Sequence, residues 1–345
     1  MLIPMQDRRI ALIGGAGFIG HNLALQLKEL GADVHIVDGL QVNHLASVTT
    51  NEHDLPNKAL YLAILNERLD LLRHAGIPLH IQDARDYHAL NRILDEMRPQ
   101  VVVQLAAVSH ANRSNKDPHT TFDHSLRTLE NALDSVRKFA EHFIFMSSSM
   151  VYGNFDSPSV TEDSICTPLG IYGALKYSGE KIVIAYNQVF DLNYTIVRPS
   201  ALYGERCISR RVGQIFIEHA IMNQEITING DGSDMLDFTY IKDLVGGIVR
   251  IIEHPNSLNE VFNLTYGNAR SLGEMLELVK EHFPDVKVRN EERDQLMPER
   301  GTLSVEKAKN LLEYTPVYSL DRGYVDYIQW YKGFVASHSE LFVQL

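Results

Sequence analysis

The sequence predicts an α/β fold in which a doubly wound parallel sheet is joined to a smaller second lobe. Short apolar runs alternate with segments of helical periodicity through the first 200 residues. Such runs are typical of strands that are buried on both faces of a parallel sheet. The chain of 345 residues also exceeds what one small core usually holds, so we expect a second lobe.

The apolar runs predict six strands, and the segments between them predict the helices that cover the sheet. The strands are expected at Arg8–Ile13, Asp33–Val37, Leu79–Gln82, Val101–Leu105, Phe143–Met146 and Tyr194–Val197. Helical spacing of apolar residues is found at Phe18–Leu30, Tyr87–Met97, Phe122–Ala140 and Tyr172–Phe190. Strand and helix therefore alternate as they do in a doubly wound sheet.

One connection is much longer than the others. About forty residues separate Asp38 from Leu79, whereas a βα connection usually has a few residues. Within this stretch, the apolar positions of Asn57–His74 predict an amphipathic helix. The simpler interpretation of the 39–78 insertion is a helical crossover with a surface excursion, and the alternative is a lid or a dimer contact.

The pattern loosens after Pro199, where the predicted strands become short. Helices are expected at Val212–Met222, Tyr240–Glu253, Ser271–His282 and Ser304–Leu312. We therefore expect residues 1–199 to form the first domain, with a return segment near residues 238–264. Residues 200–345 are expected to form most of the second lobe.

Composition excludes several classes of function. A net charge of −12 argues against a nucleic-acid surface, although a few local arginines suffice for a small phosphate ligand. The two cysteines, Cys166 and Cys207, are too few for a disulfide framework and lack metal spacing, so we expect a reducing compartment and no metal site. Met1–Gln6 leaves no room for a signal peptide, and no run approaches the ~18 apolar residues of a membrane span. A cytoplasmic protein without membrane contact is expected.

A glycine-rich loop follows the first predicted strand and opens a helix. Gly14, Gly17 and Gly20 have the spacing G-x-x-G-x-x-G, with Phe18 and Ile19 at the helix start. The first glycine suits a tight turn, the second a close approach to pyrophosphate, and the third the packing of helix against strand. The positive end of the helix would hold the diphosphate of a dinucleotide. The loop predicts a Rossmann-type domain.

Acidic and small residues at the next strand ends extend this cofactor site. Asp38 stands 18 residues beyond Gly20, where its carboxylate would accept both ribose hydroxyls and repel the 2′-phosphate of NADP, so NAD is favoured. A plain turn role before Gly39 is the alternative for Asp38. Asp83, followed by Ala84, could contact the adenine amino group or cap a helix. The small residues of Leu105-Ala106-Ala107 would let the backbone approach the cofactor.

A tyrosine, a lysine and a serine-rich turn form the predicted reaction centre. Tyr172 and Lys176 stand four residues apart and share one helix face. A free phenol has a pKa of about 10, and a lysine ammonium and a nicotinamide cation nearby would lower it. The Ser147–Gly153 turn follows the fifth strand, at the sheet edge where ligands of doubly wound sheets bind. A mere loop of turn residues is the alternative.

Five motifs together resemble a known family. They are, in order, Gly14–Gly20, Ser147–Gly153, Tyr172–Lys176, Arg198–Gly204 and Asp237–Asp243. They look like the extended short-chain dehydrogenase/reductase family, in the branch of NAD-dependent nucleotide-sugar epimerases and dehydratases to which UDP-glucose 4-epimerases belong. The resemblance runs from about residue 8 to residue 335.

This resemblance implies roles for the residues of the reaction centre. Tyr172 would be the base, Lys176 would bind the cofactor ribose and tune the tyrosine, and Ser148 would be the second hydrogen-bond partner. The implied substrate is a nucleotide-diphosphate sugar, which Ser149 and Met150 would also contact. The chemistry would begin with oxidation of a sugar hydroxyl to a ketosugar, which is then reduced again.

Met150 distinguishes between branches of the family. Dehydratases of this family carry a Glu at this position, and a thioether cannot take a proton. We therefore expect a C4 epimerase. The alternatives are a 4-dehydrogenase or ketoreductase, then a 4,6-dehydratase, and remotely a non-catalytic protein that senses dinucleotides.

Two family positions for phosphate recognition are changed. Ala201 stands where the family often has Asn, and Leu236 where it often has Arg. Arg206, Arg210 and Arg211 lie nearby and could replace the missing cation. Arg300 falls where the family commonly has a phosphate-binding arginine. We take Arg206 and Arg300 as the candidates for binding the substrate.

Further substrate candidates and the oligomeric state follow from the same resemblance. His110, Asn112 and Arg113 follow the fourth strand and could contact the sugar. The family commonly pairs two helices per subunit in a dimer contact. A homodimer through Phe122–Ala140 and Tyr172–Phe190 is therefore expected.

Overall fold

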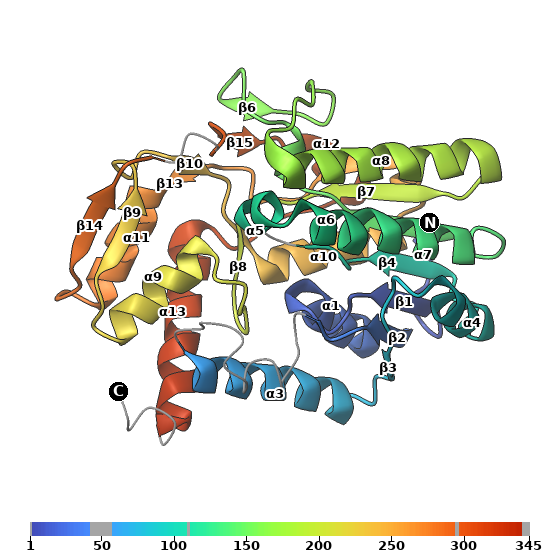
Figure 1. Cartoon of the computed structure of the whole chain (residues 1–345), viewed down its shortest axis with the longest axis horizontal. Coiled ribbons are helices and arrows are strands. Elements are labelled where there is room, and N and C mark those ends of the chain that lie inside the picture. Colours follow the sequence, from blue (N-terminus) through green and yellow to red (C-terminus); the bar gives the residue numbers. More distant parts are fainter. Residues whose placement is uncertain (1, 42–56, 109–110, 294–296, 340–345) are drawn as a thin grey trace.

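A seven-stranded parallel sheet forms the centre of the computed structural model, which describes residues 2–41, 57–108, 111–293 and 297–339 (Figure 1). The order across the sheet is β12-β7-β5-β4-β1-β2-β3. All neighbouring pairs are parallel. The strands are β1 (Arg9–Ile13), β2 (Asp33–Asp38), β3 (Leu79–Ile81), β4 (Val101–Gln104), β5 (His142–Met146), β7 (Tyr194–Arg198) and β12 (Glu260–Asn263). The predicted α/β fold with a doubly wound sheet is confirmed.

Six of these strands lie where the apolar runs predicted them. Their middle members are buried along nearly their whole length, which explains why they show no alternation of polar and apolar residues. The seventh strand, β12, comes from the later part of the chain and pairs with β7 in the register Glu260↔Thr195 to Asn263↔Arg198. Residues beyond 199 therefore complete the edge of the sheet.

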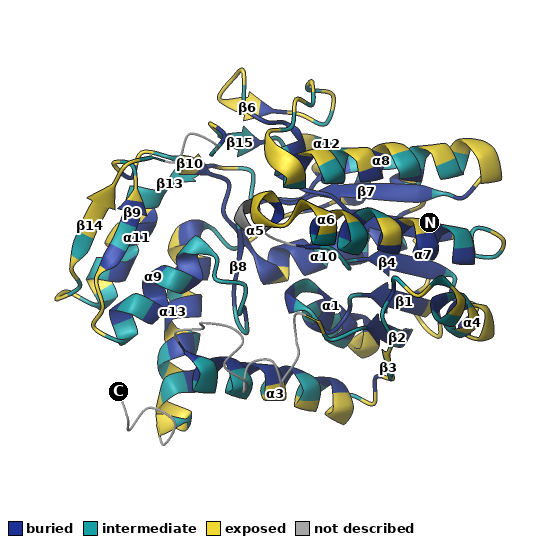
Figure 2. Ribbon diagram, in the orientation of Figure 1, coloured by how far each residue is buried: buried dark blue, intermediate teal, exposed yellow. Residues whose placement is uncertain are grey.

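Helices cover both faces of the sheet, and alternate residues of each strand point to opposite cores. On one face Ala11 and Ile13 pack with α4 (Tyr87–Met97), α7 (Thr128–Val136) and α8 (Gly170–Phe190). On the other face, Ile10 and Leu12 pack with α1 (Phe18–Glu29) and α10 (Ile241–Glu253). Figure 2 shows the strands in the colour of buried residues between helices that are exposed on their outer sides.

The long connection after β2 contains the predicted helix as α3 (Lys58–His74), while residues 42–56 lie outside the described part of the chain. Its inner face is buried and includes Arg68, which is 1% exposed. Through Tyr61, α3 reaches the buried carboxylate of Glu218 in α9 (Val212–Ile221), which also accepts a hydrogen bond from Tyr331. The helix thus forms the crossover between β2 and β3, and its buried face contacts the C-terminal part of the chain through Glu218.

Two helical segments differ from the prediction. The expected helix Phe122–Ala140 is divided into α6 (Pro118–Phe122), a π-helical turn at Asp123–Arg127, and α7, which ends at Val136. The hydroxyl of Thr128 donates to the carbonyl oxygen of His124 at 2.8 Å, a local bond that competes with regular helix bonding. The helix α13 (Leu320–Ser337) was not predicted, although its buried aromatic residues recur at helical spacing.

The remaining elements form small two-stranded sheets and helices beside the carboxyl ends of the main strands (Figure 1). The paired strands are β8 (Leu202–Tyr203) with β11 (Thr239–Tyr240), β9 (Ile226–Asn229) with β14 (Val288–Glu291), β10 (Met235–Leu236) with β13 (Arg270–Ser271), and β6 (Ser159–Val160) with β15 (Thr302–Leu303). The helices are α5 (Ala111–Lys116), α9, α11 (Leu272–His282), α12 (Glu306–Leu312) and α13.

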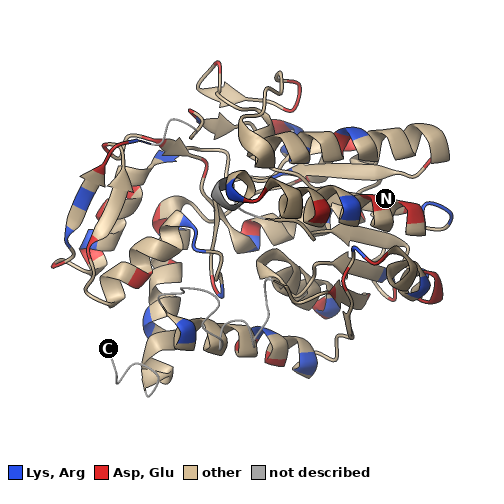
Figure 3. Cartoon of the chain, viewed as in Figure 1, with Lys and Arg blue, Asp and Glu red and all other residues tan. Residues whose placement is uncertain are grey.

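Basic residues are interspersed with acidic ones on the outer helices (Figure 3). Several form pairs within one helix, such as Arg98 with Asp95 and Arg137 with Asp134. In the described ranges, no helix has the length and apolar character that a membrane crossing requires. The same ranges hold no group of three or more metal-ligating side chains that suits an ion.

Candidate active site

A cavity of about 310 Å³ lies at the carboxyl ends of the central strands. It is built where β1, β4, β5 and β7 end, because parallel strands bring these ends to one edge of the sheet. The loops after the strands supply one wall, and α9 with the small sheets supplies the other. The lining residues are Ile19, Leu105, Ala107, Val108, Met146–Met150, Tyr172, Lys176, Pro199–Tyr203, Arg210–Gly213, Leu236, Phe238, Met275, Met297 and Arg300.

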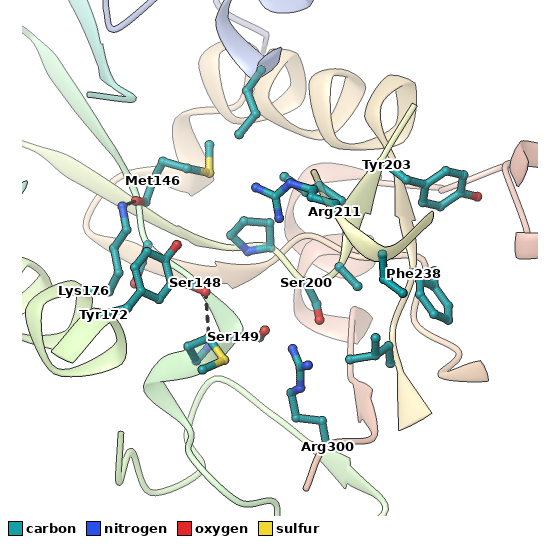
Figure 4. Close-up of a pocket in the computed structure, with 18 of the residues that line it drawn as sticks. Met146, Ser148, Ser149, Tyr172, Lys176, Ser200, Tyr203, Arg211, Phe238 and Arg300 are labelled. Carbon is teal, nitrogen blue, oxygen red and sulfur yellow. Dashed lines mark hydrogen bonds between the residues drawn. The ribbon is translucent and has the colours of Figure 1, made fainter. Parts of the chain in front are cut away.

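The three predicted catalytic residues all line this cavity (Figure 4). Tyr172 lies in the first turn of α8, and Lys176 follows one turn later on the same face. The start of α8 packs closely on the turn that carries Ser148, since a Cβ on Gly173 would lie 2.7 Å from the carbonyl oxygen of Met150. This close packing holds the phenol and the Ser148 hydroxyl at one end of the cavity.

The serines of the Ser147–Gly153 turn have different partners. Ser147 donates a 2.5 Å hydrogen bond to Glu180, so its proton is already engaged. Ser148 caps the short helix Ser149–Val151 by accepting a 3.2 Å hydrogen bond from the backbone N–H of Met150. A hydroxyl that accepts in this way still has its own proton to donate. Ser148 therefore keeps a donor for a ligand of the cavity that it lines.

Lys176 is tied to the end of β5. Its Nζ donates to the carbonyl oxygen of Met146 at 2.7 Å and lies 5.9 Å from the centre of the Tyr172 ring. Burial lowers the pKa of Lys176 to about 8, and the nearby charge of Glu180 opposes that change. The ammonium form is thus retained at neutral pH with two further N–H donors.

The phenol of Tyr172 responds to a different set of groups. Burial raises its pKa, while the charge of Arg211 and the hydroxyl of Ser148 act to lower it. The sequence predicted that Lys176 and a nicotinamide cation together would lower this pKa; the ammonium donates to the Met146 carbonyl here, and its effect on the phenol stays a prediction. The protein groups therefore leave the pKa of Tyr172 above its ordinary value.

The glycine loop forms a cradle that side chains would fill. Gly14 has φ +80°, and a Cβ there would lie 2.6 Å from the backbone nitrogen of Ala106. Gly20 packs α1 on the loop so closely that a Cβ would lie 2.4 Å from the carbonyl oxygen of Gly15. Gly17 is the N-cap of α1, so the positive end of the helix faces the loop. These features fit the phosphates of a dinucleotide.

Asp38 stabilises this loop with both of its carboxylate oxygens. It accepts hydrogen bonds from the backbone N–H of Ala16 at 3.0 Å and of Leu40 at 2.7 Å. The side chain is 8% exposed. Each oxygen keeps a further acceptor position, so contact with ribose hydroxyls stays a prediction.

The helix-cap alternative for Asp83 is wrong, because the N-cap of α4 is Asp86, which accepts from Ala89 at 3.1 Å. Asp83 instead pairs with the guanidinium of Arg85, with its shortest contact at 2.6 Å. The next residue, Ala84, is buried, and its carbonyl oxygen accepts a bond from Asn131. The adenine contact of Asp83 stays a prediction.

Three arginines line the cavity, and of the pair chosen from the sequence only Arg300 is among them. Arg210, Arg211 and Arg300 lie at its wall, and the Nε atoms of Arg211 and Arg300 are shielded from solvent with no hydrogen-bond partner in the part of the chain that the structure describes. Burial lowers the pKa of Arg300 to about 10, so it remains charged at neutral pH. Among the residues of ranges 2–41, 57–108, 111–293 and 297–339 that line the cavity, none is Asp or Glu. The electrostatic character favours an anionic ligand.

Arg206 points elsewhere, so the structure does not place it among substrate ligands. Its guanidinium contacts His21 at 3.3 Å and Glu67 at 3.2 Å. His110 lies outside the described residues, and Asn112 and Arg113 belong to the first turn of α5.

Several cavity residues were not singled out in the sequence. Phe238, Met275 and Met297 supply apolar surface, and Ser200 supplies a hydroxyl from the end of β7. Phe238 lies within the Asp237–Asp243 motif, which was a usable signal. The two methionines come from segments that carry no motif.

The sequence matches the profile of the family described as the NAD dependent epimerase/dehydratase family over residues 10–265. A putative UDP-glucose 4-epimerase of Methanocaldococcus jannaschii is 28% identical over 330 residues, which cover 94% of this chain and 98% of that protein.

Two solved structures show the same fold. The crystal structure of the UDP-glucose 4-epimerase of Thermotoga maritima with UDP-glucose superposes with a TM-score of 0.82 at 26% identity, covering 94% of this chain and 99% of the other. The UDP-glucuronic acid 4-epimerase of Bacillus cereus, crystallised with UDP-glucuronic acid and NAD, gives the same TM-score, identity and coverage.

Proposed function

Because the chain belongs to the NAD dependent epimerase/dehydratase family, we propose that it is a nucleotide-sugar epimerase that inverts C4 through a transient 4-ketosugar. The observation that carries this proposal is the cavity itself. Ser148, Tyr172 and Lys176 meet at one end of it, and Arg210, Arg211 and Arg300 line other parts of it. A substrate that places a neutral sugar at the Ser148–Tyr172–Lys176 end and an anionic nucleotide near the arginines would match this arrangement.

The cofactor of this family is NAD, and the residues at the strand ends fit it. The glycine loop with Phe18 and Ile19 would hold the diphosphate, and Asp38 the ribose. The remaining contacts would come from Asp83, Ala84 and the backbone of Leu105-Ala106-Ala107. Bound NAD accepts the sugar hydride and later donates it back. The positive charge of its oxidised nicotinamide ring favours the phenolate form of Tyr172.

Side chains of the protein then carry out the proton transfer. Tyr172 as phenolate takes the proton of the sugar 4-hydroxyl while the hydride leaves C4, so that a C=O bond forms. Ser148 donates a hydrogen bond to the same oxygen. After the ketosugar has rotated to present its other face, the hydride returns to C4 from that face and Tyr172 returns the proton. The cycle therefore has no net oxidation.

Lys176 supports this cycle by its charge. An ammonium close to the reaction centre favours the anionic form of the phenol and is available to the cofactor ribose. Its Met146 bond fixes its position without neutralising it. Lys176 thus acts by electrostatics and by holding the cofactor.

Water elimination is disfavoured by the side chains at the cavity. A 4,6-dehydratase needs a group that removes a proton next to the ketone, and Met150 stands at the position where the family provides one. The described residues of the wall supply no carboxylate in its place. A 4-dehydrogenase or ketoreductase remains the second candidate, because it would use the same three residues.

The arginines support a diphosphate substrate. Arg211 and Arg300 line the cavity, and the Nε of each has no hydrogen-bond partner among the described residues. A guanidinium suits phosphate oxygens. The solved relatives are bound to UDP-sugars, so a UDP-sugar is the first substrate to test.

A panel of UDP-, GDP-, dTDP- and CDP-sugars tests the proposal. The products are analysed by mass spectrometry and NMR, and free NADH is followed by absorbance. An epimer of unchanged mass without NADH release supports the proposal. Loss of water would establish a dehydratase, and stoichiometric NADH would establish a dehydrogenase.

We also propose a homodimer through α7 and α8. The outer face of α8 carries the exposed residues Ile171, Ala174, Ala185 and Val189, which suit a helix contact. Light scattering on the purified protein, with a mass of twice 39.0 kDa expected, tests this.

A further inference from the structure

Arg206 is fixed by contacts on both its side chain and its backbone. Its Nε donates to Nε2 of His21 at 3.3 Å, and its Nη1 lies 3.2 Å from Glu67. Its carbonyl oxygen accepts two hydrogen bonds from the guanidinium of the buried Arg68, of which the Nε contact is 2.9 Å. One residue of the arginine-rich segment 204–211 is therefore attached to both α1 and α3.

His21 can serve as the acceptor for Arg206 only in one form. The ring is fully buried, and its Nδ1 lies 2.9 Å from the carbonyl oxygen of Gly17, which can only accept. Nδ1 therefore carries the proton, and Nε2 offers its lone pair to the guanidinium. Burial lowers the pKa of His21 well below its ordinary range, and the charges of Arg68 and Arg206 lower it further. The neutral tautomer is the one that fits both neighbours.

The conformation of the segment depends on such attachment. Arg206 has φ +62° and Arg210 has φ +51°, and both values are costly for residues with a side chain. Arg210 is held from α9, because its N–H donates to Gln214 at 2.8 Å. Arg211, whose side chain lines the cavity, is the N-cap of α9. The segment thus runs from the contacts with α1 and α3 at Arg206 to the cavity wall at Arg211.

We propose that Arg206 is a positioning residue that, through its bond to His21, holds Arg210 and Arg211 in place to bind the diphosphate of the substrate. His21 lies in α1, which begins directly after Gly17 of the glycine loop. The hydrogen bond between His21 and Arg206 therefore connects the cofactor loop to the cavity wall that would bind the sugar nucleotide. This inference rests on the proposed function, because the diphosphate is the ligand that Arg210 and Arg211 would meet.

A double-mutant cycle on the full-length protein tests this bond. The variants are Arg206→Met, His21→Leu and their combination, and the readout is the Kd of UDP with NAD at saturating concentration. Each single change should raise the Kd of UDP by roughly fivefold. The Kd of the double variant should exceed that of either single variant by no more than about twofold. Arg73→Met, which removes an exposed arginine of α3, is the matched control and should leave the Kd unchanged.

The alternative roles give other patterns. If Arg206 contacted the ligand directly, His21→Leu would not change the Kd, and that result would overturn the proposal. Unchanged UDP binding in Arg206→Met, or additive losses in the double variant, would also overturn it, even if both variants melted at lower temperature.

Hydrogen exchange separates this inference from the proposed function. Amide exchange in residues 207–213 should become faster in both single variants and not in Arg73→Met. Wild-type protein that binds no UDP would argue against the proposed function and against the ligand part of this inference. Unchanged exchange would refute the anchoring itself.

Discussion

Both carboxylate oxygens of Glu180 accept hydrogen bonds from the guanidinium of Arg198, at 2.9 and 2.7 Å, and neither side chain is more than 5% exposed. Glu180 lies one helical turn beyond Lys176 and also accepts from Ser147. A buried pair with such partners is satisfied only as a unit, because removal of one member leaves a buried charge. The ion pair thus stabilises the positions of the serine turn and of Lys176.

The pH dependence of activity should report Lys176. Its pKa of about 8 in the folded protein means that the ammonium is lost as the pH rises through that value, so turnover should decline above about pH 8. The unfolded chain keeps this proton to higher pH, so the same titration raises stability between about pH 8 and 10.5. Rate profiles and urea unfolding at pH 7.5 and 9.5 would reveal falling activity without loss of fold. A profile that stays flat to pH 9.5 would contradict this role.

Glu180→Gln should move that decline to lower pH by roughly one unit, because the charge that raises the pKa of Lys176 is removed. Glu180→Asp keeps the charge and is the control. Circular dichroism at each pH confirms that both variants are folded. An unshifted profile in folded Glu180→Gln would show that Glu180 has no effect on Lys176.

Asp38→Asn should relax the preference for NAD over NADP by roughly tenfold, because it removes the negative charge that would repel a 2′-phosphate. The amide oxygen can still accept from Ala16 or Leu40, so the loop should stay folded. Competition binding of the two dinucleotides measures the ratio. An unchanged ratio would assign Asp38 to the loop alone.

Arg300→Met should weaken UDP binding by roughly 10- to 100-fold and leave the melting temperature unreduced. Within the described residues the hydrogen bond of the guanidinium goes to the sulfur of Met297, at 3.7 Å, so its removal breaks no strong hydrogen bond there. Calorimetric titration and thermal melts measure both effects. Wild-type affinity in this variant would exclude Arg300 from the diphosphate site.

Glu218→Ala should destabilise the protein by roughly 3 kcal/mol, because four buried donors on Asn57, Tyr61, Gln214 and Tyr331 would lose their acceptor. Glu218→Gln keeps an oxygen acceptor and should cost less. The free energy of urea unfolding for both variants measures the difference. Equal stability of Glu218→Ala and wild type would mean that this cluster does not hold α3, α9 and α13 together.

Local chemistry explains which parts of the fold the sequence could predict. The central strands and the Gly14–Gly20 loop were predictable because burial and tight turns restrict the residue types at each position. The same holds for Tyr172 and Lys176, whose spacing places them on one face of α8. These features depend on neighbours that are close along the chain.

The directions of the arginines could not be predicted in this way. Arg206 and Arg211 are separated by only four residues, yet one contacts His21 and the other lines the cavity. That choice is made by partners far away in the sequence. The interruption of the helix before α7 was missed for a different reason. It coincides with a local bond from the Thr128 side chain to the His124 carbonyl, and the spacing of apolar residues does not reveal such a bond.

Substitution of Tyr172 by Phe tests the central claim most directly, because it removes one hydroxyl and leaves the ring and Lys176 in place. The measurement is the turnover rate on the best sugar of the panel, with the NAD content of the same sample determined by absorbance after denaturation. We expect turnover to fall by about a thousandfold with NAD still bound. Near-normal turnover in NAD-loaded Tyr172→Phe would show that the phenol does not move the proton.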